Sequence, residues 1–402
     1  MNFILLTNET ELMHHASDTG YHVTITPPTN VASSFYEYAA NYNKAAQIIT
    51  LHLLSPGQTC IAELDTYIFS LAFLYRHSIE LILKAIAFQR LRTATDQAQF
   101  IKHISHSLDE ILKYIEQSSP SPRPSPEMEW LRSYLGDITK LDNESDSFRY
   151  PFHIISEKDK QNRGQIYSIV EIFDKQTHID LTKFTDKFKV AYKILDKWYL
   201  NDSENAVELC GLAPKFIEQS GYYYKQSVVR YGYYQNVFHP YTRGYFETAD
   251  FLRAQMRSKK NMNTQIETKL FLPMCYLYRN YTELSLKAVW FQQTNEDFQT
   301  RCKLMIKKKH SIRGMWNIIC QYAVQCNVSD ADSSFIDVLA NFYKCHNVLD
   351  CDASQFRYPM QQNMRPYFRD QQTFDYENVG AFFEALNNAV TCIEEQLRDI
   401  NE

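Results

Sequence analysis

The sequence predicts an all-α chain that contains two diverged copies of one helical domain. A charged motif inside a long apolar segment recurs 203 residues later, and apolar residues recur at helical spacing in several segments. The 402 residues include only 10 glycines and 13 prolines, too few turn-formers for an all-β protein with many tight hairpins. Hydrophobic residues make up 45% of the chain and charged residues 22%, which is normal for a protein with a buried core.

The internal repeat consists of three blocks that match in the same order. Residues 74–85 match residues 277–288, with Leu, Tyr, Arg, Glu, Leu, Leu, Lys and Ala in equivalent places. His106-Ser107 then matches His310-Ser311. The third block pairs Leu141-Asp142 and Phe148-Arg149-Tyr150-Pro151 with Leu349-Asp350 and Phe356-Arg357-Tyr358-Pro359. The offset changes from 203 to 204 and then 208, as loop insertions between fixed helices would cause.

The first copy, residues 1–200, is expected to form a bundle of four or five helices. Its apolar periodicity predicts helices near 34–53, 62–92, 104–117, 127–141 and 181–199. A Ser-Pro segment at 118–126 interrupts the chain, because proline removes a backbone donor and disfavours helix in the preceding residue. The Phe-Arg-Tyr-Pro segments are expected to be non-helical for the same reason.

The second copy, residues 241–402, is expected to repeat this bundle. Residues 35–39 resemble residues 245–249, and an amphipathic pattern over 375–400 corresponds to the last helix of the first copy. Between the copies, the tyrosine-rich residues 201–240 are expected to be either a linker that packs across both domains or a short β-ribbon. The packing linker is the favoured interpretation.

Composition restricts the compartment and the partners. The net charge of −5 excludes a generic polycationic nucleic-acid coat, but a local basic groove remains open. The nine cysteines include no CxxC pair, so reduced cytoplasmic thiols are expected, with no metal site and no cofactor. No segment has the roughly 18 uncharged apolar residues of a membrane span, and no targeting segment is visible. We therefore expect a cytoplasmic chain with no membrane partner.

A charged ladder lies inside each long apolar helix. Arg76, Glu80 and Lys84 are four residues apart and share one helix face, and the second copy repeats them as Arg279, Glu283 and Lys287. In a structural interpretation, Glu80 bridges the two cations while Asp142 and Arg149 close a buried network. The equivalents in the second copy are Asp350 and Arg357. In a functional interpretation, Arg76 and Arg149 hold a phosphate, which suits planar guanidinium groups.

His106 and His310 are the candidate acid–base residues, because each copy has one where its third helix is expected to begin. That position favours a neutral, proton-accepting imidazole. The structural alternative is a ring hydrogen-bonded to the charged network. His77 and His153 have Asn280 and Gln361 at the equivalent positions, so either histidine could matter in only one active half.

The most basic segment of the chain surrounds His310. Its cations are Lys303, Lys307, Lys308, Lys309 and Arg313. They could attract a polyanion, or they could form an ordinary solvated face. The chain has no Gly-rich phosphate loop, nucleophile elbow, HExxH or kinase signature, which weighs against those chemistries.

The combination of these motifs resembles the HEPN-like domains of prokaryotes. The resemblance rests on Tyr-Arg-His-x-x-Glu-x-x-Leu-Lys at 75–84, the His-Ser helix start and the Phe-Arg-Tyr-Pro segment, and it covers roughly 35–200 and 245–400. It implies four- or five-helix bundles that pair, so two fused copies would form a pseudo-dimer with a site between them. Many members are metal-independent ribonucleases of toxin–antitoxin and phage-defence systems, and others bind RNA or nucleotides without catalysis. Their nuclease motif is Arg followed after four to six residues by His, and no arginine of this chain has that spacing.

Two functional hypotheses follow from the sequence. In the first, a HEPN-like pseudo-dimer binds RNA or a nucleotide between the copies through Arg76, Arg279, Arg149 and Arg357, with Lys84, Lys287, Lys308 and Lys309 nearby. It cuts RNA, if it is an enzyme, with His106 or His310 as base and without metal. In the second, the chain is a non-catalytic adaptor whose polar network is structural. An antitoxin, a defence-complex subunit or a second copy of the chain would be its protein partner.

Overall fold

Helices dominate the computed structural model, which describes residues 20–57, 60–104, 106–117, 125–158, 164–202, 206–219, 221–230, 236–259, 265–326 and 354–401. The first half contains α2 (Val31–Leu54), α3 (Ile61–Arg90), α4 (Ala94–His103), α5 (Leu108–Gln117), α6 (Pro126–Leu141) and α7 (Leu181–Leu200). The second half contains α8 (His239–Lys259), α9 (Ile266–Gln292), α10 (Phe298–Lys308), α11 (Ile312–Gln325) and α13 (Tyr376–Asn401). The expectation of a mainly helical chain is confirmed. No helix of these residues is long and apolar enough to cross a membrane.

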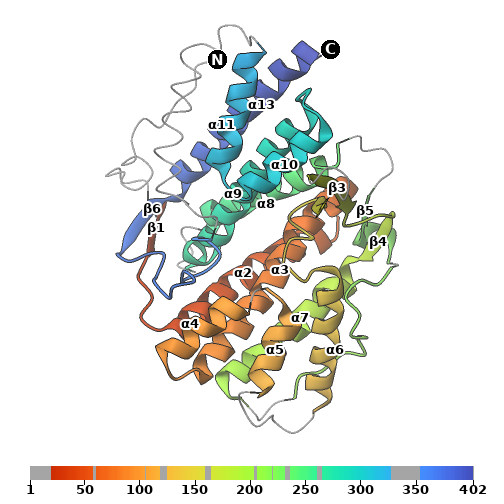
Figure 1. Cartoon of the computed structure of the whole chain (residues 1–402). Helices are drawn as coiled ribbons and strands as arrows, with labels where there is room; N and C mark the ends of the chain where they lie inside the picture. Colours follow the sequence, from red (N-terminus) through yellow and green to blue (C-terminus); the bar gives the residue numbers. More distant parts are fainter. Residues whose placement is uncertain are drawn as a thin grey trace.

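Four helices form the centre of the molecule. α3 and α9 are apolar on nearly every side, and both are buried along most of their length. A helix with this composition needs cover on all sides. α2 and α8 supply much of it: α3 packs against both, and so does α9. Figure 1 shows the two halves side by side, with these four helices along their boundary.

Short polar side chains set the starts of the helices. The side chains of Asn30, Thr93, Ser125, Asp180 and Asp297 each accept a hydrogen bond from a backbone N–H three residues later. Such caps satisfy donors that have no partner inside the helix. The expected helix over 104–117 is shorter than predicted, because a bend at His106 separates α4 from α5.

Two small β-ribbons link the halves reciprocally. β1 (His22–Ile25), ahead of α2, pairs with β6 (Gln372–Asp375), ahead of α13. β5 (Gln226–Val229), ahead of α8, pairs with β4 (Thr177–Asp180), ahead of α7. The strand before each half's first helix thus pairs with the strand before the other half's last helix. Part of the connection at 201–240 is therefore a β-ribbon, the less favoured of the two sequence interpretations.

One β-hairpin of the first half was not predicted from the sequence. β2 (Phe152–Lys158) pairs with β3 (Gln165–Glu171) directly after the first Phe-Arg-Tyr-Pro segment. After the second such segment, the described residues have only an isolated bridge between Met360 and Pro366. The described residues of the two halves therefore differ directly after the Phe-Arg-Tyr-Pro segments.

The flanking repeat aligns differently in space from the sequence match of 35–39 with 245–249. The Tyr42 hydroxyl donates to the Phe356 carbonyl at 3.0 Å, and the Tyr245 hydroxyl donates to the Phe148 carbonyl at 3.2 Å. Tyr42 and Tyr245 are 203 residues apart, the same offset as the charged ladder. These equivalent contacts show that Tyr42, and not Phe35, corresponds to Tyr245 in the repeat.

Candidate functional site

A fully buried carboxylate forms the centre of the charged ladder in the first half. Glu80 accepts a hydrogen bond from Arg76 on Oε2 and one from Lys84 Nζ on Oε1, the latter at 2.7 Å. The side chains of Arg76, Glu80 and Lys84 are 0%, 0% and 5% exposed. The four-residue spacing brings the three together on one side of α3. Burial raises the pKa of Glu80, but the charges of Lys84 and Arg76 and the hydrogen bond from His106 outweigh it and hold this pKa well below its ordinary value.

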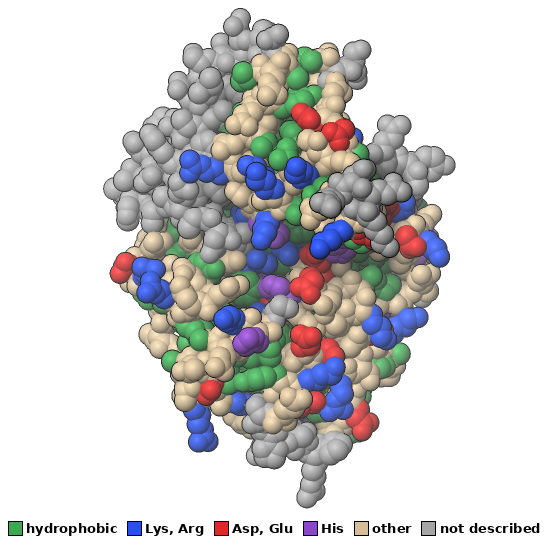
Figure 2. Space-filling model, viewed as in Figure 1, with side chains coloured by type: hydrophobic (Ala, Val, Ile, Leu, Met, Phe, Trp, Pro, Cys, Tyr) green, Lys and Arg blue, Asp and Glu red, His purple; other side chains and the backbone are tan. Residues whose placement is uncertain are grey.

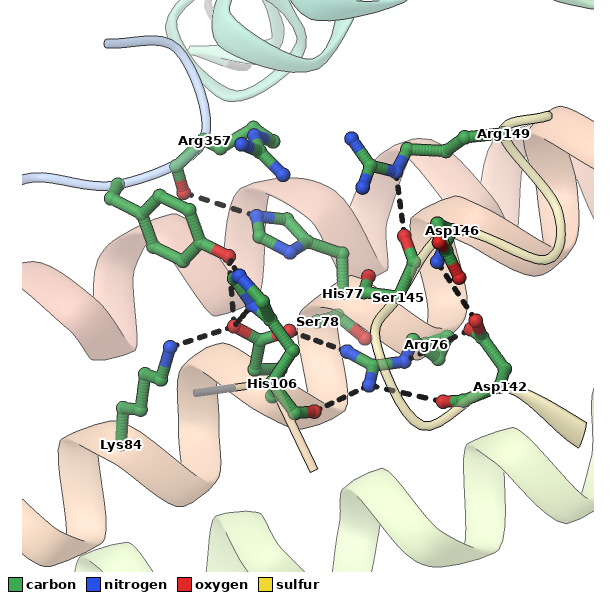
Figure 3. Close-up of polar contacts among 12 residues, drawn as sticks. Arg76, His77, Ser78, Lys84, His106, Asp142, Ser145, Asp146, Arg149 and Arg357 are labelled. Carbon is green, nitrogen blue, oxygen red and sulfur yellow. Dashed lines mark hydrogen bonds and ion pairs between the residues drawn. The ribbon is translucent and has the colours of Figure 1, made fainter. Parts of the chain in front are cut away.

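Arg76 uses its whole guanidinium group within the protein. Its Nε lies 3.2 Å from Asp142 Oδ2, and Nη2 donates to the backbone carbonyls of His106 and Asp142. Asp142 Oδ1 in turn accepts the N–H groups of Asp146 and Ser147, each at 2.9 Å. Figure 3 shows Arg76 between the His106 segment and Asp142. These contacts make Arg76 a tie between segments rather than an accessible phosphate ligand.

The second half repeats the ladder. Glu283 accepts from Arg279 on Oε2 and from Lys287 Nζ on Oε1, the latter at 2.6 Å. Arg279 Nη2 donates to the His310 carbonyl, as Arg76 does to the carbonyl of His106. Asp350, the expected partner equivalent to Asp142, lies outside the described residues. Each ladder therefore has its own central carboxylate, two cations bonded to it, and a histidine segment held by the arginine.

Arg149 was expected to close the first network, but its hydrogen bonds go to Ser145 and Tyr276 and not to the first ladder. Arg149 Nε donates to the Ser145 carbonyl at 2.6 Å, and Nη1 donates to the Tyr276 hydroxyl at 3.4 Å. The Arg357 guanidinium lies over the rings of Tyr276 and Tyr358. Figure 3 shows the guanidinium groups of Arg149 and Arg357 pointing toward one another. Both side chains are buried at the boundary between the halves.

The tyrosine of each Phe-Arg-Tyr-Pro segment completes the site of the opposite half. The Tyr358 hydroxyl donates to Glu80 Oε1 at 2.8 Å, and the Tyr150 hydroxyl donates to Glu283 Oε1 at 2.7 Å. Lys84 also lies over the Tyr358 ring, and Lys287 over the Tyr150 ring. The repeated segment was visible in the sequence, but the site served by each tyrosine was not. The two tyrosines are the site residues that sequence reasoning missed.

Each candidate histidine binds its buried glutamate through Nδ1. His106 Nδ1 lies 3.0 Å from Glu80 Oε1, and His310 Nδ1 lies 3.0 Å from Glu283 Oε1. Because the ionised carboxylate only accepts, we assign the proton to Nδ1, which leaves Nε2 as the acceptor of a neutral ring. The side chains are 31% and 47% exposed, so both rings border solvent. Both histidines precede their helices, α5 and α11, by two residues and do not lie inside them.

The surroundings of His106 favour the neutral ring. Glu80 alone would raise the pKa of His106, but burial and the charges of Lys84 and Arg357 outweigh it. The pKa of His106 is therefore lowered from its ordinary value. A neutral imidazole with its Nδ1 proton fixed is suited to accept a proton at Nε2.

His310 follows the same balance in the second half. Glu283 raises the pKa of His310 through its charge and its hydrogen bond, whereas burial, Arg149 and Lys287 lower it. The lowering contributions prevail. The surroundings of both candidate bases therefore favour the neutral imidazole.

A pocket of about 220 Å³ opens beside His310. Its polar lining comes from both halves: Asp146, Tyr150, His153, Lys287, Lys309 and His310. Lys309 is exposed and has a left-handed backbone, with φ of +49°, directly after α10. This turn brings the basic segment to the rim of the pocket.

The other lysines of the basic segment precede Lys309 and belong to α10. Lys307 is exposed, while Lys308 is half-buried with its Cδ near Gly314. Cations at the end of a helix also stabilise its dipole, so α10 itself explains part of this cluster. Figure 2 shows Lys and Arg side chains over α10, with His side chains below them. Lys309 is the lysine of this run that lines the pocket.

Within the part of the chain that the structure describes, no group of three or more His, Cys, Asp and Glu could hold a metal ion. The side chains gathered at the site present imidazole, carboxylate, phenol, guanidinium and ammonium groups. Comparison of the chain with protein-family models, curated proteins and solved structures finds no match to any of the three.

Proposed function

We propose that the chain binds RNA at the boundary between its halves and cleaves it with a histidine base. In this proposal the halves are two HEPN-like bundles fused into a pseudo-dimer. One observation carries it: His106 and His310 each have Nδ1 bonded to a buried glutamate, while their rings border solvent. This leaves Nε2 as the proton acceptor of a positioned, neutral imidazole.

The reaction needs a base for the ribose 2′-hydroxyl and cations for the phosphate. His310 supplies the base at the pocket, and Lys309 and Lys287 line the same space. Lysines are point charges that bind phosphate well without a fixed geometry. Arg76 and Arg279 are buried and bonded within the protein, so their role here is to hold the histidine segments in place.

The biological setting that fits this proposal is prokaryotic defence or stress response. A ribonuclease of that kind needs control, so an antitoxin or a defence-complex subunit is the protein partner that we propose. A second copy of the chain could add to the assembly.

The test is incubation of the purified chain with labelled tRNA and total RNA in EDTA. The wild type is compared with His106→Ala/His310→Ala and with a matched control, His22→Ala/His178→Ala, whose histidines lie outside the site. Cleavage that persists in the control and disappears in the site variant supports the proposal, provided that both variants keep the thermal midpoint. A shifted but intact RNA restricts the function to binding, and neither shift nor cleavage at low salt sinks the proposal.

The alternative function is a non-catalytic interaction protein. The observation that favours it is the complete burial of Arg76 and Glu80, whose charges satisfy one another. It agrees with the missing Arg-x4–6-His spacing. This alternative predicts that the purified chain binds no RNA even at low salt. Destabilisation by Arg76→Ala or Glu80→Ala is expected under both functions and does not separate them.

A further inference from the structure

The pocket beside His310 contains a second histidine that the repeat does not explain. His153 lies in β2 of the first half and lines this pocket together with His310. Its Nδ1 lies 3.3 Å from Asp146 Oδ2, and its side chain is 40% exposed. Two histidines therefore line the pocket, one from each half, and each is paired with a carboxylate.

The hairpin holds His153 in place. On one side of β2, Phe152 is buried and packs against the ring of Phe291 in α9. On β3, the backbone N–H of Tyr167 donates to Gln299 Oε1 at 2.7 Å, and Gln299 Nε2 donates back to the Tyr167 carbonyl at 2.9 Å. Because Gln299 belongs to α10, the hairpin is fixed to the helix that leads into His310.

The two histidines have opposite protonation tendencies. The hydrogen bond to Asp146 raises the pKa of His153, and the charges of Asp146 and Asp142 add to it against burial. The pKa of His310 is lowered, as described above, by burial, Arg149 and Lys287. Pairs of groups whose environments separate their pKa values are typical of an acid and a base in one site.

The other charged and titratable groups around the pocket come from several elements. Tyr150 of the turn bonds to His310 Nδ1 at 2.9 Å, and Lys287 reaches the pocket from α9. Arg279 donates to the backbone carbonyl of His310 and to Glu283, and Lys309 lines the rim of the pocket. Near His153, the carboxylates are those of Asp146 and Asp142.

We propose that His153 is the general acid opposite His310, and that the pocket cleaves single-stranded RNA by transesterification. This inference rests on the proposed function. His310 Nε2 takes the proton of a ribose 2′-hydroxyl, and the 2′-oxygen forms a bond to phosphorus. The bond from phosphorus to the 5′-oxygen breaks, and protonated His153 gives its proton to that oxygen. The products are a 2′,3′-cyclic phosphate and a 5′-hydroxyl, with no change in oxidation state.

The substrate is single-stranded because the pocket, at about 220 Å³, is too small for a duplex. Unpaired RNA can present one sugar and its phosphate to such a space. The same inference assigns different roles to the two halves. Gln361 and Ser354 stand 208 residues after His153 and Asp146, so the repeat gives the His106 site no equivalent acid–carboxylate pair.

The test uses the full chain and an oligodeoxynucleotide with one central ribonucleotide, in EDTA. His153→Gln introduces the residue that the repeat has at position 361, and His22→Gln is the control. Loss of a general acid should slow cleavage by about 100-fold or more. The same variant should recover to within about 10-fold of the wild type on a substrate with sulfur in place of the bridging 5′-oxygen, because a thiolate leaves without protonation. His310→Gln should remain slow on both substrates.

The outcomes separate the inference from the function on which it rests. Selective rescue of His153→Gln by the sulfur substrate, loss of the alkaline limb of its pH–rate profile and a cyclic phosphate product support the inference. Wild-type rates in His153→Gln overturn it while RNA cleavage stands. The absence of cleavage by the wild type on any RNA overturns both.

Discussion

The hydroxyl of Tyr150 lies 2.7 Å from the buried carboxylate of Glu283 and donates to it across the boundary between the halves. Tyr358 makes the equivalent contact with Glu80 at 2.8 Å. Each charged network therefore receives one hydroxyl from the opposite half, and neither half alone contains a complete site. Any change in how the halves pack would alter the hydrogen bonds of both glutamates and, through them, both candidate bases.

Replacing Tyr150 by Phe should remove a hydrogen bond to a buried charge. We expect the free energy of unfolding to fall by about 1.5–3 kcal/mol, the range typical of such bonds. Urea unfolding measures the change, with Tyr222→Phe as the control because Tyr222 is 67% exposed. In a double-mutant cycle with Glu283→Gln the two effects should be non-additive. Additive effects would mean that the bond contributes nothing across the boundary.

Arg76→Ala should destabilise the chain strongly, because it leaves Glu80 and Asp142 buried beside fewer positive charges. Removal of one partner of a buried pair costs about 3–5 kcal/mol. Lys189→Ala is a suitable control, since its ion pair with Asp186 is exposed and should contribute less than about 1 kcal/mol. Chemical unfolding of both variants distinguishes the roles. If Arg76→Ala abolished RNA binding and left the free energy of unfolding unchanged, Arg76 would be a phosphate ligand and not a structural residue.

The pH dependence of stability should reflect the two buried glutamates. The pKa of Glu80 and that of Glu283 lie well below the ordinary value of 4.5 in the folded chain. The unfolded chain therefore binds more protons than the folded chain as the pH falls below that value, and the free energy of unfolding falls as the pH falls. The contribution is fully present above pH 4.5 and is lost as the pH falls through the folded pKa values. Unfolding of Glu80→Gln between pH 3 and 6 should show a smaller slope, and an unchanged slope would contradict the assignment.

The sequence was most informative where local periodicity and repetition determine structure. The ladder of Arg76, Glu80 and Lys84 places three charges on one helix face, so their mutual contacts follow from helix geometry. The hairpin at 152–171 was not predicted. Its residues do not recur at helical spacing, and no helix or strand was predicted for them from the sequence. Which Glu each tyrosine reaches depends on the packing of the halves, which no local pattern encodes.

The positions of the histidines could also be predicted only in part from the sequence. Their repetition indicated a shared role, but α4 ends at His103 and α5 begins only at Leu108, so His106 lies ahead of its helix. The pairing of His153 with Asp146 was also out of reach, because the turn that brings them together belongs to the unpredicted start of the hairpin. The sequence indicated only that His153 is not repeated, because Gln361 occupies the equivalent position in the second copy.

Gly244→Ala should weaken the contact between the halves. A Cβ at Gly244 in α8 would lie 2.1 Å from the Thr66 carbonyl oxygen in α3, which is far inside van der Waals contact. Because backbone must move, we expect a loss of about 1–3 kcal/mol or more in the free energy of unfolding. Gly136→Ala in α6 is the matched control, since its Cβ would meet nothing within 4 Å. Gly136→Ala should raise the free energy of unfolding by about 0.5–1 kcal/mol. If both substitutions changed this free energy equally, the close approach of α8 to α3 would not lie at Gly244.

Lys309→Gln should weaken RNA binding without unfolding the chain. Lys309 is exposed at the rim of the His310 pocket, so its charge can reach a phosphate while the core is left intact. Loss of one phosphate contact lowers the slope of log affinity against log salt by about 1. Titrations at several salt concentrations, with the non-cleaving His310→Gln chain as background, measure this slope. Lys140→Gln, at a side chain that is 78% exposed in α6, should leave the slope unchanged. If both substitutions lower it equally, RNA binds by diffuse attraction and the pocket has no special part in holding the phosphate.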